Sequence, residues 1–344
     1  ACGNIKAINQ GKEMHSLIFK RGLERDASIS SALVAIYGRC QLFTEAHGTL
    51  RRQEVEDVVS WNALMSGYAD HGLVEEAMKA FEIMQTKGLY PDSVTFICIL
   101  KGCCRNKAIG SVRQLHIEIA KQGNENELTV GNALMDSYVK CGSLSEAEKV
   151  FNSLKVQDVI SWTSLIAGYA FQGMSEIVFY LFQKMGEKGI CPDAIALQSI
   201  LTVCNHSGLV DKGYTYFEAI SREYGETPTL SHHNAMVDAL ARAGQLEEVV
   251  EMLDKMPLQP DHVTWLSVLS ACRKWGHVKL GEKAFINAVK LDEEDDAAFF
   301  LMYNIYLDAE MWEDAKRIET IKLKAADGIK DERVIEIHNV IQNI

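Results

Sequence analysis

Residues 57–68 read DVVSWNALMSGY, and residues 158–169, which lie 101 positions further on, read DVISWTSLIAGY. The same offset of 101 superposes Cys40 on Cys141 and the pair Pro91-Asp92 on Pro192-Asp193. Similarity at a fixed offset is typical of repeat proteins, in which one supersecondary unit is copied and stacked. We therefore expect a linear array of repeats and not a closed globular core.

Smaller repeats lie inside this long period, because turn signals recur about every 31 to 36 residues. Residues 27–261 divide into seven repeats, which are 27–57, 58–92, 93–127, 128–158, 159–193, 194–229 and 230–261. A partial repeat occupies residues 1–26. The place of a residue is its position counted from the first residue of its repeat.

Each repeat is predicted to form two short helices. Apolar residues recur three and four positions apart, as Ala77, Phe81 and Met84 do, and this spacing gathers them on one helix face. Glycines at the fifteenth place predict a left-handed turn after the first helix; they are Gly72, Gly142, Gly173, Gly208, Gly244 and Gly276. Strand signals are absent. Because one hairpin cannot bury its apolar face alone, we expect an all-α, right-handed superhelical solenoid of helix-turn-helix repeats with a concave inner surface.

Composition excludes several classes of protein. The 344 residues are 47% hydrophobic, which excludes a disordered chain. The sequence contains no run of 18 apolar residues, the length that a membrane-spanning helix needs. With 35 Lys+Arg against 47 Asp+Glu the net charge is −12, so any contact with nucleic acid must be local. The nine cysteines contain no Cys-x-x-Cys pair and mostly share equivalent places, which favours small buried thiols over disulfides or zinc ligands.

The amino-acid sequences of the repeats resemble those of one protein family. Residues 57–68, with the closing run Gly88-Leu89-Tyr90-Pro91-Asp92, resemble a pentatricopeptide repeat (PPR). The alternation of 35 or 36 with 31 or 32 residues, and the segments QGKEMH (10–15) and VGNALMDSY (130–138), are similar to the long and short motifs of the plant organellar PLS subclass. Residues 1–26 correspond to a partial long motif.

The C-terminal part resembles the E extension motifs of RNA-editing factors. Residues 262–295 are similar to the first extension motif, and residues 296–329 to the second, which forms a tetratricopeptide-like hairpin. The resemblance thus implies that the solenoid ends in two tetratricopeptide-like hairpins. Residues 330–344 depart from the family pattern and form an eroded tail. Only the segment Val334-Ile335-Glu336-Ile337 corresponds to the sequence expected there.

The resemblance implies that each repeat addresses one nucleotide of single-stranded RNA through its fifth and last residues. A terminal Asp is an acceptor only, so it favours uracil or guanine, which carry a ring N–H. An Asn at the fifth place reaches a small pyrimidine, whereas Ser or Thr leaves room for a purine. The predicted pairs are Ser31 with Asp57 for G, Asn62 with Asp92 for U, Asn132 with Asp158 for U, Thr163 with Asp193 for G, and Asn234 with Asp261 for U.

Two long motifs offer combinations that specify no base, Ile97 with Glu127 and Gln198 with Thr229. The predicted footprint is therefore 5′-GUnUGnU-3′. In editing relatives the target cytidine would lie four nucleotides beyond the base read by the last short motif. The resemblance also implies that the apolar second residues pack against base faces; these are Val59, Val94, Ile160 and Ile195.

Each of these roles has a structural alternative. The apolar second residues would serve as well in ordinary packing at the start of a helix. Asp57, Asp92, Asp158 and Asp193 all stand just before a predicted helix, where N-capping is the usual role of Asp. Capping and base contact can coexist in one carboxylate.

No catalytic machinery is predicted. The DYW deaminase domain of many relatives needs His-x-Glu and Pro-Cys-x-x-Cys to hold zinc. Only His116-Ile117-Glu118 fits its first half, and no Cys-x-x-Cys follows. We expect a non-catalytic chain with no cofactor, metal or small-molecule substrate, whose deaminase acts in trans or is missing from this chain.

Three functional hypotheses remain open. The first is a site-recognition factor for C-to-U RNA editing in a mitochondrion or chloroplast, with a deaminase-bearing or accessory protein docked on residues 262–329. The second is a non-catalytic PPR component of an organellar ribosome or another RNA–protein assembly. The third is a tetratricopeptide-type scaffold with no RNA role. The transit peptide is not in this chain, which begins at Ala1 and is expected to be a fragment.

Overall fold

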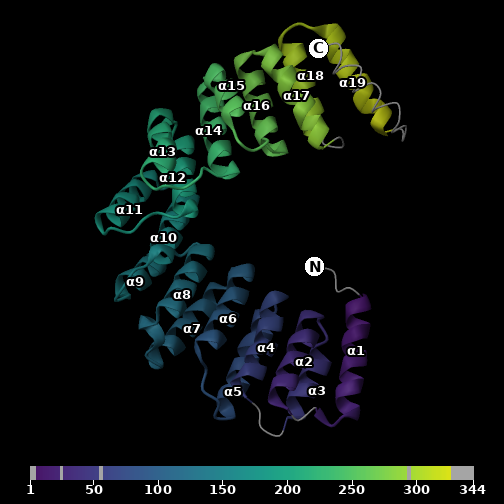
Figure 1. Ribbon diagram of the computed structural model, residues 1–344, viewed down its shortest axis with the longest axis vertical. Helices are drawn as coiled ribbons and strands as arrows, with labels where there is room; N and C mark the ends of the chain where they lie inside the picture. The colour runs from purple at the N-terminus through teal and green to yellow at the C-terminus, as the bar shows by residue number, and fades with distance from the viewer. Residues whose placement is uncertain (1–4, 24–25, 54–56, 293–295, 327–344) are drawn as a thin grey trace. The chain divides into compact units, whose positions relative to one another are not determined.

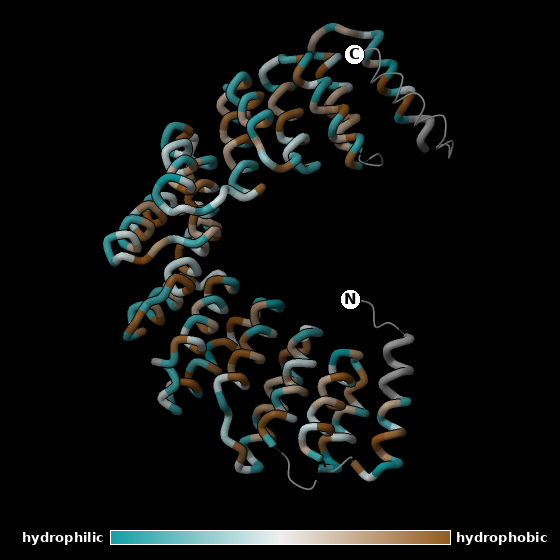
Figure 2. The backbone as a smooth tube through the Cα atoms, in the orientation of Figure 1, coloured by the Kyte–Doolittle hydropathy of each residue, from teal (hydrophilic) through white to brown (hydrophobic). Residues whose placement is uncertain are grey.

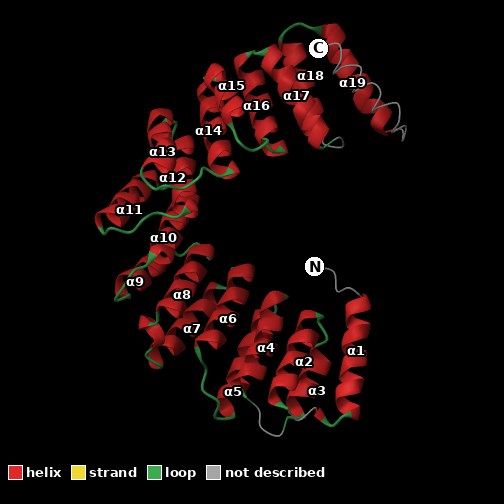
Figure 3. Ribbon diagram, in the orientation of Figure 1, coloured by secondary structure: helices red, strands yellow, loops and turns green. Residues whose placement is uncertain are grey.

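The computed structural model describes residues 5–23, 26–53, 57–292 and 296–326 (Figure 1). Their regular structure is entirely helical, and no strand occurs in these ranges (Figure 3). The chain divides into two compact bodies, Ala1–Tyr169 and Ala170–Ile344. The predicted tail 330–344 lies outside the described residues, as do residues 1–4 and 24–25 of the partial repeat.

The helices of the first body are short and follow one another in pairs. They are α1 Ile5–Lys20, α2 Ala27–Arg39, α3 Phe43–Arg51, α4 Val58–Asp70, α5 Val74–Thr86, α6 Ser93–Asn106, α7 Ile109–Lys121, the 3₁₀ turn η2 Asn124–Asn126, α8 Leu128–Lys140 and α9 Leu144–Ser153. The boundary between the bodies falls within α10, Val159–Phe171.

The second body continues the same alternation. Its helices are α11 Ser175–Glu187, α12 Ala194–His206, α13 Val210–Arg222, α14 Leu230–Ala243, α15 Leu246–Lys255, α16 His262–Trp275, α17 Val278–Leu291, α18 Asp296–Asp308 and α19 Trp312–Ala326. None of the described helices is long and apolar enough to cross a bilayer.

Each body is a stack of helical hairpins. In the first body α2, α4, α6 and α8 lie side by side, and α3, α5, α7 and α9 each pack against the helix before them (Figure 1). In the second body α12, α14, α16 and α18 form the corresponding row, paired with α13, α15, α17 and α19. The prediction of an all-α solenoid of stacked hairpins is confirmed.

The core runs between the two rows of helices. Ala77, Phe81 and Met84 are buried, as their spacing predicts, and apolar residues recur along the helices of both bodies (Figure 2). Neighbouring first helices also come very close. A Cβ added to Gly67 of α4 would lie 2.8 Å from the Cα atom of Gly38 in α2, so a larger residue at this crossing would push the two hairpins apart.

The turn at the fifteenth place is left-handed throughout the described repeats. The six glycines predicted there have φ between 67° and 82°, which confirms the prediction. At the fifteenth place of the repeat 27–57, the repeat 93–127 and the hairpin that begins at Asp296, the residues are not glycine but still have positive φ. They are Gln41 (62°), Lys107 (52°) and Glu310 (61°). Backbone hydrogen bonds within the hairpin close these turns, as from Leu42 N–H to the Tyr37 carbonyl (2.9 Å) and from Met311 N–H to the Tyr306 carbonyl (2.8 Å).

A tyrosine at the eleventh place links successive hairpins. Its hydroxyl hydrogen-bonds a polar side chain on the second helix of the preceding hairpin, as Tyr68 does with His47 (2.7 Å) and Tyr138 with His116 (2.9 Å). Tyr169 donates to Glu148 (3.0 Å) in the same way. Burial lowers the pKa of the two histidines in these contacts, whereas the negative charges of the nearby Glu76 and Glu125 act to raise it.

Cysteine takes the eleventh place in three other repeats. Cys103, Cys204 and Cys272 are buried free thiols, and burial raises their pKa to about 12, 11 and 12. These thiols confirm the predicted buried role, whereas Cys40 and Cys141 are only half-buried and Cys191 is exposed.

Candidate nucleic-acid interface

Grooves follow the row of first helices in both bodies. In the first body, one groove of about 290 Å³ is lined by α2, α4 and α6, and a second of about 530 Å³ by α6 and α8. In the second body a groove of about 780 Å³ is lined by α12, α14 and α16. The groove-lining residues include Asn62 and Val59 in the first body and Asn234 in the second. Several predicted RNA-binding residues therefore lie in grooves of the same helix row.

The predicted pair Asn62 and Asp92 is in direct contact. Asn62 Nδ2 donates to Asp92 Oδ1 at 2.9 Å, and the same oxygen accepts the backbone N–H of Thr95 at 2.8 Å, so Asp92 caps α6. The Thr95 hydroxyl is placed to donate to Asn62 Oδ1 (2.7 Å) and to Asp92 Oδ1 (2.8 Å), and it accepts the N–H of Asp92. The three side chains form one closed network.

The network recurs at the next predicted uracil position. Asn132 Nδ2 donates to Asp158 Oδ1 at 3.1 Å, and the Ser161 N–H caps onto the same oxygen at 2.9 Å. The Ser161 hydroxyl lies 2.7 Å from Asn132 Oδ1. Asn132 is 8% exposed and Asn62 is 6% exposed. In both networks a buried Asn donates to an Asp that is more exposed than the Asn itself.

The third pair, Asn234 with Asp261, differs in the carboxylate oxygen that accepts and in the contact of the hydroxyl. Asn234 Nδ2 donates to Asp261 Oδ2 at 3.1 Å, and Asp261 Oδ1 caps the Thr264 N–H at 2.9 Å. The Thr264 hydroxyl donates to Asp261 and not to Asn234. As a result, Asn234 Oδ1 is a buried oxygen with no hydrogen-bond partner among the described residues.

The three Asp carboxylates remain ionised more readily than an ordinary Asp. Burial alone would raise the pKa of Asp92, but hydrogen bonds from Thr95 and Asn62 outweigh it and lower the pKa. At Asp158 and Asp261, too, burial acts to raise the pKa, but the hydrogen bonds outweigh it and the pKa is lowered. Each group is thus a charged acceptor that cannot donate at neutral pH.

The two predicted guanine pairs are placed less uniformly. Asp57 and Asp193 both cap their helices, through the N–H of Ser60 (2.7 Å) and Ala196 (2.8 Å). The Ser31 hydroxyl donates to Ser28 O of its own helix, and no hydrogen bond joins it to Asp57. Thr163 is buried in the first body, whereas Asp193 belongs to the second. The structure brings together the three Asn–Asp pairs but not Ser31 with Asp57.

The predicted base-stacking residues are exposed. Val59, Val94, Ile160 and Ile195 are between 53% and 61% exposed. More than half of each side chain is therefore open to solvent in the absence of RNA. Val263, at the same place of the hairpin 262–295, is 71% exposed and was not among the predicted residues.

Basic residues at the thirteenth place line the grooves although the chain is acidic. Arg39, Arg105 and Lys140 do so in the first body, and Arg242 and Lys274 in the second, and all five are exposed. Lys140 is paired with Asp136 (2.6 Å) and Arg242 with Asp238 (2.9 Å). The guanidinium of Arg39 has no partner among the described residues.

The long motifs carry other contacts. The carboxylate of Glu127 accepts the Ser93 hydroxyl at 2.6 Å, and Thr229 caps α14 at the His232 N–H. Gln198 Nε2 approaches the Thr202 hydroxyl at 3.4 Å, and its Oε1 is buried without a hydrogen-bond partner among the described residues. None of these contacts repeats the Asn–Asp–hydroxyl arrangement.

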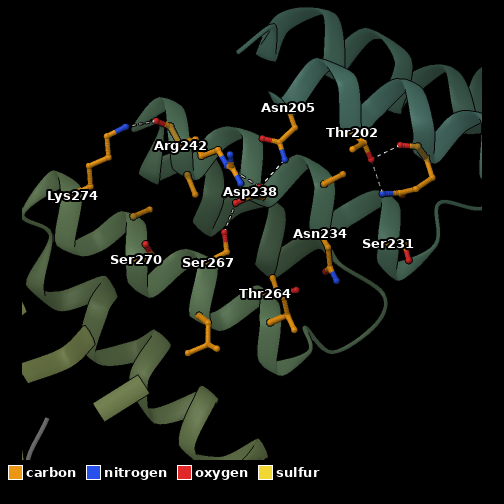
Figure 4. Close-up of a pocket in the computed structure, with 16 residues that line it drawn as sticks. Thr202, Asn205, Ser231, Asn234, Asp238, Arg242, Thr264, Ser267, Ser270 and Lys274 are labelled. Carbon is orange, nitrogen blue, oxygen red and sulfur yellow. Dashed lines mark hydrogen bonds and ion pairs between the residues drawn. The ribbon is translucent and has the colours of Figure 1, made fainter. Parts of the chain in front are cut away.

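A polar cluster holds the groove of the second body together (Figure 4). Asp238 of α14 accepts Asn205 Nδ2 of α12 at 2.7 Å and the Ser267 hydroxyl of α16, and it pairs with Arg242. Burial would raise the pKa of Asp238, but these bonds outweigh it and lower the pKa. Three first helices are thus tied at one carboxylate.

Sequence reasoning missed the hydroxyl at the third place. Thr95 and Ser161 complete the networks, and Thr264 completes a variant of it. The signal was a Ser or Thr three positions after a terminal Asp, a spacing typical of an N-cap. His116, considered as a zinc ligand, contacts Tyr138, and no group of three potential ligands that could hold a metal occurs in the described ranges.

Stacked hairpins with a recurring polar site on one helix row define a helical repeat protein whose repeats carry equivalent sites. Comparison with known proteins specifies the family. The PPR repeat family profile matches residues 56–105 and 157–206, and the PPR repeat profile matches residues 132–159 and 231–258. The chain belongs to the PPR repeat family.

Relatives in Arabidopsis thaliana share about a third of the residues. A chloroplastic pentatricopeptide repeat-containing protein is 35% identical over 99% of this chain and 46% of its own length. A mitochondrial one is 33% identical over 96% of this chain and 52% of its own length. The chain spans about half the length of these relatives.

Solved structures show the same fold. The crystal structure of the pentatricopeptide repeat protein PPR10 in complex with an 18-nt psaJ RNA element has a TM-score of 0.72 at 17% identity, over 93% of this chain and 48% of that one. The structure of PPR10 from maize gives a TM-score of 0.71 at 17% identity, over 96% and 47%.

Proposed function

We propose that this chain binds single-stranded RNA in an organelle, one repeat per nucleotide, and acts as a site-recognition factor for C-to-U editing. The observation that carries the proposal is the recurring network in which a buried Asn donates to a more exposed Asp near an exposed apolar residue. Such a site combines a fixed hydrogen-bond acceptor with a surface on which a base can stack. The solved PPR10 complex with RNA supports this use of the fold.

Within each pair, the Asp and the Asn contact different groups of the base. At Asn62 and Asp92, Asp92 Oδ1 is occupied by the cap and by Asn62, whereas Oδ2 has no partner among the described residues. Oδ2 then accepts the ring N–H of uracil, and one N–H of Asn62 Nδ2 remains for a base oxygen. Cytosine and adenine lack this ring N–H.

Carried along the chain, the pairs specify the footprint 5′-GUnUGnU-3′. The three Asn–Asp pairs supply the U positions, and Ser31 with Asp57 and Thr163 with Asp193 supply the G positions. Ser31 has no bond to Asp57, so we expect weaker selection at the first nucleotide than at the second.

The grooves also account for binding by an acidic chain. The basic side chains at the thirteenth place, such as Arg39 and Arg105, put positive charge where the RNA backbone would lie. Two of them are already paired with carboxylates, Lys140 with Asp136 and Arg242 with Asp238. Few counterions are released, so the affinity falls only gently with salt.

The editing role and the location rest on the resemblance of residues 262–329 to E extension motifs and on the chloroplastic and mitochondrial relatives. The last hairpin exposes two large aromatic residues, Phe300 (57%) on α18 and Trp312 (60%) on α19. Exposed aromatic side chains suit a protein interface. We place the deaminase-bearing partner on this surface.

Binding of the purified chain to an RNA that contains GUnUGnU, compared with a probe in which every U and G is exchanged for C and A, tests the proposal. Preference for the first probe, retained across a salt series, is the expected result. Equal binding to both probes would contradict base reading and favour a role as a component of an RNA–protein assembly.

A further inference from the structure

The groove of the second body does not stop at the last of the seven repeats. Val263, Leu266, Ser267 and Lys274 of α16 line the same groove as Asn234 of α14. These residues belong to the hairpin 262–295, whose resemblance to an extension motif points to a protein partner. On the groove side, however, α16 continues the surface formed by α12 and α14 (Figure 4).

Two features of α16 match those of the RNA-binding repeats. Val263, at the second place, is 71% exposed, more than any of the four predicted stacking residues. Lys274, at the thirteenth place, corresponds to Arg242 of α14, and its Nζ donates to the Arg242 carbonyl at 3.2 Å. That contact uses one of the three N–H bonds of the ammonium group, so two remain for a phosphate.

Polar contacts hold α16 in register with α14. Asp261 at the end of the seventh repeat caps α16 through the Thr264 N–H, and it accepts Asn234 of α14. Ser267 donates to Asp238 of α14. The site for the last predicted uracil and the start of α16 therefore share one carboxylate, and an RNA bound at Asn234 would pass directly over Val263.

We infer that α16 binds one further nucleotide of RNA, on the 3′ side of GUnUGnU, without selecting its base. Val263 stacks on the base, and Lys274 contacts its phosphate. The fifth place of this hairpin is Leu266, which has no hydrogen-bonding group in its side chain, so the base edge is not read. This inference rests on the proposed function.

The extension is limited to one nucleotide. In the next hairpin, the thirteenth place is Asp308, which carries the opposite charge and pairs with Arg273 at 3.2 Å. A carboxylate where Lys274 and Arg242 stand in the preceding hairpins repels the RNA backbone. The surfaces of α18 and α19 remain available to a protein partner.

The test compares a 7-nt RNA of sequence GUnUGnU with four 8-nt RNAs that add A, C, G or U at the 3′ end. The full chain should bind each 8-nt RNA about tenfold more tightly than the 7-nt RNA, because the added base covers the exposed Val263 side chain and the added phosphate contacts Lys274; tenfold corresponds to about 1.4 kcal/mol. A ninth nucleotide should add less than about twofold, because the thirteenth place of the next hairpin is the carboxylate Asp308.

Val263→Ser and Lys274→Gln should each reduce the gain from the eighth nucleotide, measured as the ratio of the affinities of one protein for the 8-nt and 7-nt RNAs. Lys279→Gln is the matched control, because Lys279 is exposed on α17 and lines none of the three grooves described above. Because the gain is a ratio measured within one protein, partial loss of folded protein does not alter it.

An absent gain, or one that survives in both variants, would overturn the inference while selective binding of the 7-nt RNA left the proposed function standing. A gain confined to one base would overturn the absence of selection. Failure to bind the 7-nt RNA selectively counts against the proposed function itself.

Discussion

Thr95→Val removes one hydroxyl from the centre of the first Asn–Asp network and keeps the shape of the side chain. The Thr95 hydroxyl lies 2.7 Å from Asn62 Oδ1 and 2.8 Å from Asp92 Oδ1. Valine leaves Asn62 Oδ1 buried without a donor, and Asn62 itself is only 6% exposed. The carboxamide is then free to turn away from Asp92.

The cost follows from the burial of the orphaned oxygen. An unsatisfied buried polar group costs about 1–3 kcal/mol, and in a domain of this size each kcal/mol lowers Tm by roughly 2–4 °C. For RNA, loss of the fixed orientation of one neutral hydrogen-bonding group costs about 1 kcal/mol, or roughly fivefold in the preference for U over C at the second nucleotide of the footprint.

Thermal unfolding followed by circular dichroism measures the first effect, and competition binding with GUnUGnU and GCnUGnU measures the second. Thr264→Val is the matched control, because Thr264 is also buried and its N–H donates to Asp261 as that of Thr95 does to Asp92, but its hydroxyl does not reach Asn234. Selection at the seventh nucleotide should persist in that variant. Equal loss of selection in the two variants would refute the orienting role of the hydroxyl.

Three further predictions follow from the fold and the site. Asn62→Thr combined with Asn132→Thr should move preference at two nucleotides from U toward G at unchanged helicity; unchanged preference in the binding assay would contradict the base assignments. The pKa of His47 is lowered in the folded state. As the pH falls below about 6.5, the His47 imidazole therefore binds a proton more readily in the unfolded chain than in the folded one, and this favours unfolding. The free energy of unfolding should therefore be lower at pH 5.5 than at pH 7.5, and this decrease should be smaller in His47→Gln than in the unchanged protein. An equal decrease in the two proteins would show that His47 does not contribute to it. Gly142→Ala, at φ 79°, should destabilise by about 1–2 kcal/mol, whereas Gly48→Ala, in open space within α3, should stabilise by about 0.5–1 kcal/mol in the same denaturation experiment; reversed signs would contradict the turn geometry.

Much of the fold was predictable because it is local. The 101-residue offset, the spacing of Ala77, Phe81 and Met84, and the glycines at the fifteenth place all act within a hairpin. Gln41, Lys107 and Glu310 were not recognisable as turn residues. Their left-handed φ is accompanied by backbone hydrogen bonds that close the turn, such as Ala108 N–H to the Cys103 carbonyl, and the identity of the residue at the turn does not reveal these bonds.

The site was predictable in part for the same reason. Asp92 and Asp158 precede their helices, so their capping role was visible from neighbouring residues. The partners of Asp92 in the network also include Asn62, which lies 30 residues earlier. The position of Asn62 opposite Asp92 was inferred from a family resemblance, and the Ser31–Asp57 pair inferred in the same way has no hydrogen bond.

The sequence by itself determined the period, the helical hairpins, the turn glycines and the net charge of −12, because each depends on residue identity and short-range spacing. Only the tertiary structure decided which side chains share a groove. It closed the networks at Thr95 and Ser161, exposed Val263, and set basic residues such as Arg39 along a groove of an acidic chain. These results depend on contacts about 30 residues apart, which arise only when hairpins stack.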